Sequence, residues 1–263
     1  DRALQFEAQQ ALTSGVEAAG AKGGILVAMR PGSGEILATV SVERDDDGVV
    51  RLSTAHRAVT WSYEPGSIIK PLTFSALLDA GLAEPDTVRE VPYRIHVHDS
   101  DFTDSSPHEN EDWTVAEIVR RSSNVGTILW AQEAGATTLH TKLVDFGLGQ
   151  ATGLGFPGEA DGILLPVAKW SGTSLPTIAI GQGVATTPLQ MLTAYATLAN
   201  RGFWPAPILV LGMRDHGGVF ESFANNVGRR VVSEATAKEL IVMMEEAVRS
   251  GTGIKAQVPG YRV

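Results

Sequence analysis

The chain of 263 residues contains no cysteine, which excludes disulfide bonds and metal sites built on thiolates. No apolar run reaches the roughly 18 residues that a membrane-spanning helix needs. Basic residues are fewer than acidic ones, 21 against 30, and the net charge of −9 argues against a nucleic-acid-binding surface. The first residues read as part of a helix and show no signal-peptide pattern. What remains is a globular composition, 43% hydrophobic and 19% charged, in a chain long enough for a sizeable core.

Hydrophobic periodicity predicts strands and helices in separate blocks, without regular alternation. A helix that ends near Gly20 is predicted from apolar residues at helical spacing, Leu4, Ala8, Leu12 and Val16. Residues 24–29 and 35–40 flank a Pro-Gly-Ser-Gly turn and predict a hairpin, and one more hairpin element is expected near 208–213. Further helices are predicted at 114–121, 125–135, 137–146, 188–200 and 234–249. We therefore predict an α+β fold in which a central antiparallel sheet carries the terminal helices beside an all-helical lobe.

Two polar segments invite a metal-site interpretation, but the sequence favours surface structure for both. Residues 45–48, Asp-Asp-Asp-Gly, lack the spaced ligands of a calcium loop and are predicted to be a solvated loop. Residues 90–112 are rich in candidate ligands without a helically spaced pattern, so we predict a surface excursion of short strands and loops over a zinc site. Those candidates are His96, His98, Asp99, Asp101, Asp104 and His108. No metal and no other cofactor is expected.

The most informative chemistry lies in Ser67-Ile68-Ile69-Lys70. Apolar residues predict a buried helix that opens near Ser67, so Ser67 and Lys70 share one face. A desolvated lysine with a lowered pKa is able to take the proton of a serine hydroxyl, which is otherwise a weak nucleophile. Backbone N–H groups at a helix start also point toward an oxyanion formed at the attacked carbonyl. A capped helix with a solvated lysine is the alternative for this short pattern.

A second polar group, Ser122-Ser123-Asn124, follows an amphipathic run and supplies another hydroxyl and a carboxamide. A helix cap is the alternative interpretation for Ser122 and Asn124. Serine-x-x-lysine followed by a serine-x-asparagine-type motif is typical of penicillin-binding proteins and class A β-lactamases.

On these motifs the chain resembles the transpeptidase domain of class B penicillin-binding proteins of cell division and elongation. The stretch from Glu64 to Pro71 resembles that family's nucleophile box, and Arg121 to Gly126 resembles its second box. The resemblance extends over nearly the whole chain. It includes three further stretches, Gly181-Gln182-Gly183, Thr187-Pro188-Leu189-Gln190 and Ala199-Asn200-Arg201-Gly202. The family's third motif, Lys-Thr-Gly, does not occur in the sequence, and the resemblance implies a strand carrying it directly after Val263. The sequence is therefore interpreted as one incomplete transpeptidase domain, 1–263, missing its C-terminal strands, with a helical subdomain at roughly 60–200 between sheet-forming parts.

The resemblance implies roles for six residues. Ser67 would be the nucleophile, Lys70 its base and Ser122 a proton relay, while Asn124 would donate to the amide carbonyl of the substrate. Glu64 is a candidate for substrate binding, with a cap or ion pair at the helix start as its alternative. Gln182 is another, although the glycines around it equally suggest a purely structural turn.

The implied substrates are the D-alanyl-D-alanine ends of peptidoglycan stem peptides, and β-lactams would acylate the same serine. Division or elongation membrane proteins are expected as partners, and nucleic acid is not. The expected location is the extracytoplasmic face of the bacterial membrane, with an anchor outside this chain. Two alternatives stay open: a serine β-lactamase, for which no suitable deacylating glutamate stands out between Asn124 and Gly183, and a catalytically incomplete fragment that binds partners.

Overall fold

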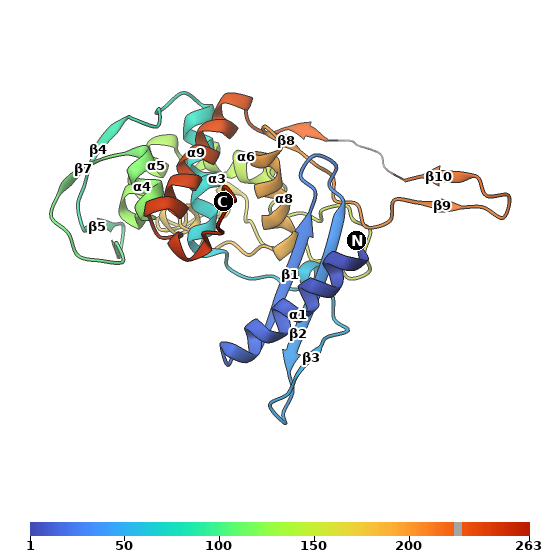
Figure 1. Cartoon of the computed structure of the whole chain (residues 1–263). Coiled ribbons are helices and arrows are strands. Elements are labelled where there is room, and N and C mark those ends of the chain that lie inside the picture. The colour runs from blue at the N-terminus through green and yellow to red at the C-terminus, as the bar shows by residue number, and fades with distance from the viewer. Residues whose placement is uncertain (224–227) are drawn as a thin grey trace.

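The computed structural model describes residues 1–223 and 228–263 and has two layers of unequal size, a small sheet and a larger helical lobe (Figure 1). The sheet has the strand order β1-β2-β3 and is antiparallel throughout. Its strands are β1 (Gly23–Met29), β2 (Ile36–Arg44) and β3 (Val50–Leu52). The predicted hairpin is thus confirmed, and the acidic segment 45–48 forms the turn that leads from β2 to β3.

Helix α1 (Arg2–Ala18) covers one face of this sheet. Its buried residues Ala8 and Val16 pack on alternate residues of β2, which are Ala38, Val40 and Val42. The side chain of Gln5 exchanges two hydrogen bonds of 2.9 Å with the backbone of Thr39 and so fixes the helix along the strand. The N-terminal helix predicted from spacing is confirmed, and it ends two residues before Gly20.

The helical lobe is built around α3 (Lys70–Asp79), which is buried on all sides. A helix without a polar face must lie inside a core, and α3 contacts α5, α6 and α9. The short helix α2 (Arg57–Thr60) precedes the lobe. The other helices of the lobe are α4 (Val115–Arg121), α5 (Asn124–Ala134), α6 (Ala136–Asp145), α7 (Ser174–Ala179), α8 (Pro188–Ala199) and α9 (Glu234–Ser250). The described residues also include the 3₁₀ turns η1 (Gly66–Ile69), η2 (Val167–Lys169) and η3 (Ile254–Ala256). All five helices predicted from periodicity between residues 114 and 249 are present within two residues of their predicted bounds.

The polar excursion lies at the far end of this lobe (Figure 1). Two antiparallel pairs form it, β4 with β7 and β5 with β6. The strands are β4 (Val88–Val91), β5 (Arg94–Val97), β6 (Ser100–Thr103) and β7 (Glu111–Thr114). Short strands and loops are therefore present as predicted. The expectation of a surface segment was wrong for Asp104, which is buried at the base of the excursion against the start of α5, and the His108 side chain beside it is only 11% exposed.

The C-terminal part of the chain differs in two details from the sequence-based expectation. Helix α9 packs on α3, α4 and α8, because its apolar stripe of Ala237, Leu240 and Met243 completes the helical core instead of covering the sheet. The second hairpin begins later than predicted, since Ile208 forms a parallel bridge with Glu35 beside the sheet. The strands of this part of the chain are β8 (Phe203–Trp204), β9 (Gly212–Arg214), β10 (Phe220–Ser222) and β11 (Arg229–Arg230). Strands β9 and β10 form a hairpin that projects from the body (Figure 1).

In the part of the chain that the structure describes, no helix combines the length and the apolar character needed to cross a bilayer.

Candidate active site

Ser67 lies in the 3₁₀ turn η1, which leads without a break into α3. The predicted helix start near Ser67 is therefore a tighter turn, and the α-helix proper begins at Lys70. Pro71, in the first turn of α3, lacks an N–H that would have no intrahelical partner there and so suits this position. Ser67 is exposed, whereas Ile69 and Lys70 point into the core. The turn thus presents an exposed hydroxyl three residues before a buried amine.

The loop after α7 holds this turn from the other side. The Gly66 N–H donates to the Gly181 carbonyl at 2.9 Å, and the Gly183 N–H donates to Glu64 Oε1 at 2.8 Å. Gly181 has φ +86°, and a Cβ there would lie 2.1 Å from the Gly66 carbonyl oxygen, so only glycine fits. Glu64 therefore contacts the backbone of the loop, while Gln182 lies exposed between the two glycines. The structure brings both predicted residues next to η1, which carries Ser67 and is called the nucleophile turn after the predicted role of that serine, and it gives Glu64 a bracing contact.

Tyr195 of α8 is a further support that sequence reasoning missed. Its hydroxyl donates to the Ile68 carbonyl at 2.7 Å, which ties η1 to α8. Burial raises the pKa of Tyr195, so its hydroxyl remains a donor at neutral pH. No local motif marks this residue, because the two partners are far apart in the sequence.

Lys70 is only 2% exposed, and its amine is held by the second motif. Nζ donates to the Ser122 carbonyl at 2.6 Å, to Asn124 Oδ1 at 2.8 Å and to Ser122 Oγ at 3.1 Å. All three acceptors are uncharged, and burial lowers the pKa of Lys70 to about 8, although the negative charge of Asp104 acts in the opposite direction. Among the described residues, the hydrogen bonds of Lys70 go to this turn and not to Ser67. The site therefore contains a lysine that loses its proton more readily than an exposed lysine does.

The turn that binds Lys70 joins α4 to α5. Ser122 adopts the left-handed conformation, φ 55° and ψ 42°, which is uncommon for a residue with a side chain. Ser123 caps α5, because its Oγ accepts from the Gly126 N–H at 2.8 Å. The cap proposed as an alternative role for Ser122 and Asn124 is thus supplied by the residue between them, and both are free to face Lys70. Asn124 also donates through Nδ2 to the Thr103 carbonyl at 2.9 Å, which fixes its amide plane.

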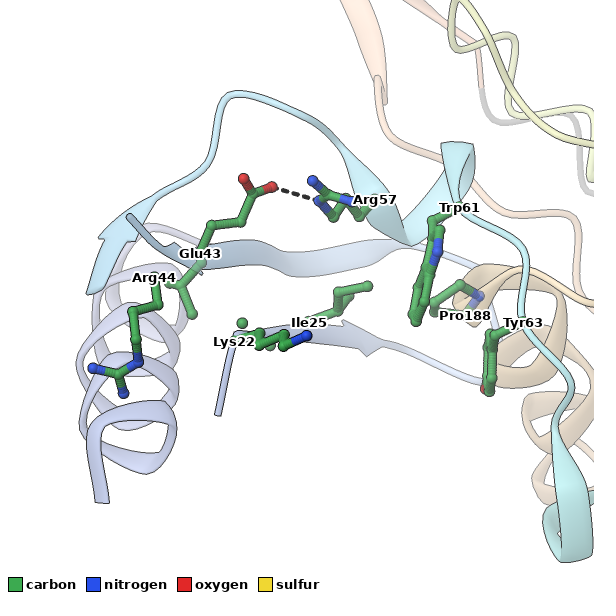
Figure 2. A pocket seen from close by; sticks show the side chains of 11 residues that line it. Lys22, Ile25, Glu43, Arg44, Arg57, Trp61, Tyr63 and Pro188 are labelled. Atoms are coloured by element: carbon green, nitrogen blue, oxygen red, sulfur yellow. Dashed lines mark hydrogen bonds and ion pairs between the residues drawn. The ribbon is translucent and has the colours of Figure 1, made fainter. Parts of the chain in front are cut away.

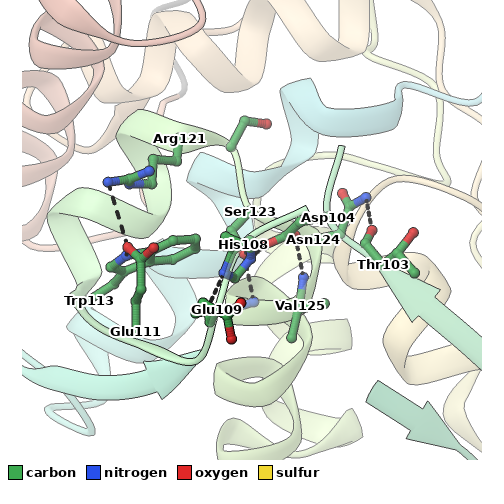
Figure 3. A network of polar contacts seen from close by, with 12 residues as sticks. Thr103, Asp104, His108, Glu109, Glu111, Trp113, Arg121, Ser123, Asn124 and Val125 are labelled. Carbon is green, nitrogen blue, oxygen red and sulfur yellow. Dashed lines mark hydrogen bonds and ion pairs between the residues drawn. The ribbon is translucent and has the colours of Figure 1, made fainter. Parts of the chain in front are cut away.

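A buried polar network lies behind this turn (Figure 3). Asp104 accepts from Ser123 Oγ at 2.6 Å and from the Val125 N–H at 2.9 Å. His108 approaches the same carboxylate through Nε2 at 3.2 Å. Sequence reasoning noted both residues as members of the polar excursion but did not connect them with the second motif. A buried carboxylate at the N-terminus of α5 is nonetheless well placed there, since it meets the unpaired N–H groups of the helix.

A separate hollow of about 560 Å³ lies beside the sheet, lined by residues of β1, of the end of β2 and of the segment 57–63. Figure 2 shows Trp61 and Tyr63 on one wall and Lys22 and Ile25 on the other, with the Glu43–Arg57 ion pair above. The two aromatic rings stack at 5.6 Å. They belong to the segment that leads into Glu64, so the hollow adjoins the nucleophile turn.

Within the described ranges, no group of three or more histidine, cysteine or acidic side chains is arranged to hold a metal ion.

Comparison with known proteins places this arrangement in a family. A family model described as the penicillin binding protein transpeptidase domain matches residues 24–263. Penicillin-binding protein PbpB of Mycolicibacterium smegmatis is 34% identical over an alignment covering all of this chain and 42% of that protein. Peptidoglycan D,D-transpeptidase FtsI of Escherichia coli strain K12 is 29% identical over an alignment that covers 100% of this chain and 43% of that protein. The chain thus spans less than half the length of these curated relatives.

Solved structures agree with the sequence comparisons. Penicillin binding protein 3 from Mycobacterium tuberculosis, complexed with aztreonam, has a TM-score of 0.92 at 32% identity, over 99% of this chain and 61% of that chain. The transpeptidase domain of penicillin-binding protein 3 from Burkholderia pseudomallei has a TM-score of 0.85 at 29% identity. The match covers 100% of this chain and 73% of that chain. These likenesses confirm the predicted α+β fold class and the resemblance seen in the motifs. The chain belongs to the family of class B penicillin-binding protein transpeptidase domains.

Proposed function

We propose that this domain catalyses acyl transfer in peptidoglycan synthesis, as a serine D,D-transpeptidase that β-lactams acylate at Ser67. The observation that carries the proposal is the state of Lys70. Its amine is buried, has a pKa of about 8, follows the exposed Ser67 by three residues, and is bonded to Ser122 and Asn124. Two relatives named for this activity or for penicillin binding share the whole length of the chain.

In the first step, the free amine of Lys70 takes the proton of Ser67 Oγ, which attacks the carbonyl carbon of the penultimate D-alanine. A new C–O bond forms, and the carbonyl oxygen becomes an oxyanion. The Ser67 N–H, in the 3₁₀ turn at the start of the helix, is positioned to donate to that oxyanion. Catalysis at neutral pH follows from the lowered pKa of Lys70, because an exposed lysine with its ordinary pKa near 10.4 would be almost fully protonated.

In the second step, the C–N bond breaks and the leaving amine needs a proton. Lys70 now carries one, and Ser122 Oγ lies 3.1 Å from its Nζ, so Ser122 is placed to relay the proton to the leaving nitrogen. Asn124 donates one amide hydrogen to the Thr103 carbonyl, so its second amide hydrogen can donate to the substrate's amide carbonyl. Attack by the amine of another stem peptide on the Ser67 ester then completes the cross-link and regenerates the serine.

We assign the remaining roles on the same basis. Glu64 and Gln182 flank the nucleophile turn and are proposed to shape the substrate-binding surface, Glu64 through the loop it braces. The whole of 1–263 is proposed to be one transpeptidase domain, with its helical subdomain at roughly 60–200. Proposed partners are peptidoglycan stem peptides, β-lactams and membrane proteins of division or elongation, at the extracytoplasmic face of the membrane.

Covalent labelling of the full-length protein by a fluorescent penicillin tests the assignment of the nucleophile. Ser67→Ala deletes the oxygen that forms the ester and should abolish labelling. Ser62→Ala, five residues earlier in the same segment, serves as the matched control and should label like the parent. Labelling that persists in Ser67→Ala at another residue would contradict the proposal.

The same material separates the two alternative functions. Rapid turnover of a chromogenic β-lactam, without an accumulating acyl-enzyme, would favour a serine β-lactamase. A parent protein that is folded and yet takes no label would favour a catalytically incomplete partner-binding protein. Stable labelling with slow turnover is the result expected for a transpeptidase.

A further inference from the structure

The two ring nitrogens of His108 both face oxygen atoms. Nδ1 lies 2.7 Å from the Glu109 carbonyl oxygen, and Nε2 lies 3.2 Å from Asp104 Oδ2. A carbonyl oxygen only accepts hydrogen bonds, and so does an ionised carboxylate. A neutral imidazole has one donor and one acceptor nitrogen and cannot satisfy both contacts. Both contacts are satisfied at once when both ring nitrogens carry protons and donate, one to the Glu109 carbonyl and one to Asp104; Figure 3 shows the ring with both partners.

Asp104 is a buried carboxylate, only 7% exposed, and its other contacts bind it to the second motif. Ser123 Oγ and the Val125 N–H both donate to it, one from the middle of the Ser122–Asn124 turn and one from the first turn of α5. A buried negative charge is costly unless an opposite charge accompanies it. The imidazolium of His108 supplies that charge and at the same time limits the rotation of the carboxylate.

We propose that Asp104 and His108 form a buried positioning ion pair that fixes the Ser122–Asn124 turn around Lys70 and shields Lys70 from the Asp104 charge. The pair contacts neither substrate nor the reacting atoms, and it acts through the turn. The proposal rests on the proposed function only for its kinetic readout, because the protonation of His108 is observable without any reaction.

The surroundings of the pair contain few other titratable groups. The His108 ring packs on Trp113 with ring centroids 4.5 Å apart, and it forms a T-shaped contact with Tyr93 at a centroid distance of 6.0 Å. Arg121 covers Trp113, and Glu111 accepts from the Trp113 indole N–H. Arg120 and Arg121 both pair with Glu117 beside a hollow of about 310 Å³ that reaches Asp104 and His108. Guanidinium groups keep their charge throughout the working pH range. On the other side of the turn, the contacts of Lys70 Nζ are uncharged, and Asp104 is the carboxylate that acts on it.

Removing His108 and removing the charge of Asp104 should shift the pKa of Lys70 in opposite directions. Without His108, the Asp104 charge is no longer offset and the pKa of Lys70 rises. Without the Asp104 charge, the pKa of Lys70 falls further, because the carboxylate that raises it is gone. A turn that merely loosened would slow acylation in both variants without displacing their pH profiles in opposite directions. Opposite displacement is therefore the signature of the ion pair.

The kinetic test uses the second-order rate of acylation of the full-length protein by one fluorescent penicillin between about pH 6 and 10. The variants are His108→Gln and Asp104→Asn, which keep side chains of similar size. We expect both to acylate ~10- to 100-fold more slowly at their optimum, as for other displaced catalytic groups. The acidic limb should move to higher pH in His108→Gln and to lower pH in Asp104→Asn. If the acidic limbs of the two pH profiles stay where they are in the parent, or both move in the same direction, the electrostatic role is overturned.

His96→Gln is the matched control, because His96 also contacts an aspartate, Asp101, at 3.0 Å in the same excursion but is 65% exposed. Its rate and pH profile should equal those of the parent. An effect as large as that of His108→Gln would show that the whole excursion is responsible and would overturn the specific pair.

The second measurement is independent of reactivity. In protein labelled with ¹⁵N-histidine, the resonances lost in His108→Gln identify the ring, and both of its nitrogens should carry protons at neutral pH. A ring with a single proton would overturn the ion pair and would place the missing proton on Asp104. Failure of the parent to take a penicillin label would instead contradict the proposed function, while the state of the ring would still decide whether the pair exists.

Discussion

At the scale of single residues, the nature of the groups around Lys70 decides what the site can do. Its amine has three acceptors, and all are uncharged oxygens of Ser122 and Asn124. A carboxylate in direct contact would hold the proton on the amine, because an opposite charge favours the ionised form. Asp104 acts only from behind the turn, so burial prevails and the pKa of Lys70 falls to about 8. The three hydrogen bonds hold the ammonium form in place, and after the loss of one proton the amine keeps two donors and gains a lone pair that can accept a proton.

This pKa predicts the pH dependence of acylation. Only the free amine accepts the proton of Ser67, so the acylation rate of the full-length protein should rise with pH and level off above about 8. Below that pH, the rate should fall about tenfold for each pH unit, as expected for a single essential base. Second-order rates with one fluorescent penicillin across this range provide the measurement. A rate independent of pH between about 6 and 9 would contradict a base with this pKa.

Two lysine variants show whether the fall of the acylation rate below about pH 8 comes from protonation of Lys70. Lys70→Arg keeps the charge but not the base, since a guanidinium does not lose its proton in proteins. Acylation should then slow by ~100-fold or more and lose its limb near pH 8. Lys142→Arg is the control, because Lys142 is also largely buried but pairs with Asp79 at 2.7 Å, away from the site. Its acylation should resemble that of the parent.

At the scale of elements, the nucleophile turn is set by segments that come from distant parts of the chain. The segment 63–66 is bonded to the loop 181–186 through Tyr63, Glu64 and Gly66. Tyr195 of α8 adds a bond to Ile68, and Thr73 of α3 donates to the Ala179 carbonyl at 2.8 Å. These bonds run between backbones or from side chains to backbone, so they fix the path of the turn itself and with it the position of Ser67.

Gly181→Ala should disrupt this arrangement. The new Cβ would lie 2.1 Å from the Gly66 carbonyl oxygen, and φ +86° is unfavourable for alanine. We expect a loss of ~2 kcal/mol or more in the free energy of unfolding, from strain and from the displaced backbone. Denaturant unfolding measures the loss, and penicillin labelling should slow in parallel.

Gly153→Ala separates the clash from the strain. Gly153 has a similar φ of +81°, but a Cβ there meets nothing within 4 Å. This variant should lose only ~1 kcal/mol, the cost of the left-handed conformation, and should label at the parent's rate. Equal losses in the two variants would mean that the contact with Gly66 is unimportant.

Features with a local pattern are the ones that the sequence reveals. The helix of residues 2–18 and the first hairpin follow from apolar spacing and a glycine-rich turn, and Ser67, Lys70, Ser122 and Asn124 follow from two short motifs. The contact of Tyr195 with Ile68 spans 127 residues and has no such pattern. The sequence assigned Asp104 and His108 to a surface excursion of short strands and loops, because nothing local shows that the start of α5 buries Asp104. Likewise, the apolar stripe of α9 fits a sheet as well as a helical core, and only tertiary packing decides between them.

At the scale of the whole molecule, one core supports the nucleophile turn from below. Ile69 and Leu72, next to the site, belong to the same buried cluster as Leu240 and Met243 of α9. A second, smaller cluster joins α1 to the sheet. Since α3 contacts α5, α6 and α9, the position of Lys70 depends on helices drawn from nearly the whole length of the chain. Damage to α9 should therefore reach the site although no residue of α9 belongs to it.

Leu240→Ala tests this dependence. Leu240 is 0% exposed, so its truncation leaves a cavity and should lower the free energy of unfolding by ~2–5 kcal/mol. Val242→Ala, two residues along the same helix at 54% exposure, should change it by less than ~0.5 kcal/mol. Urea unfolding gives both values, and penicillin labelling close to the Leu240→Ala midpoint should fall together with the folded fraction. If labelling instead survives after α9 has unfolded, the helix is not part of the core that holds Ser67 and Lys70 together.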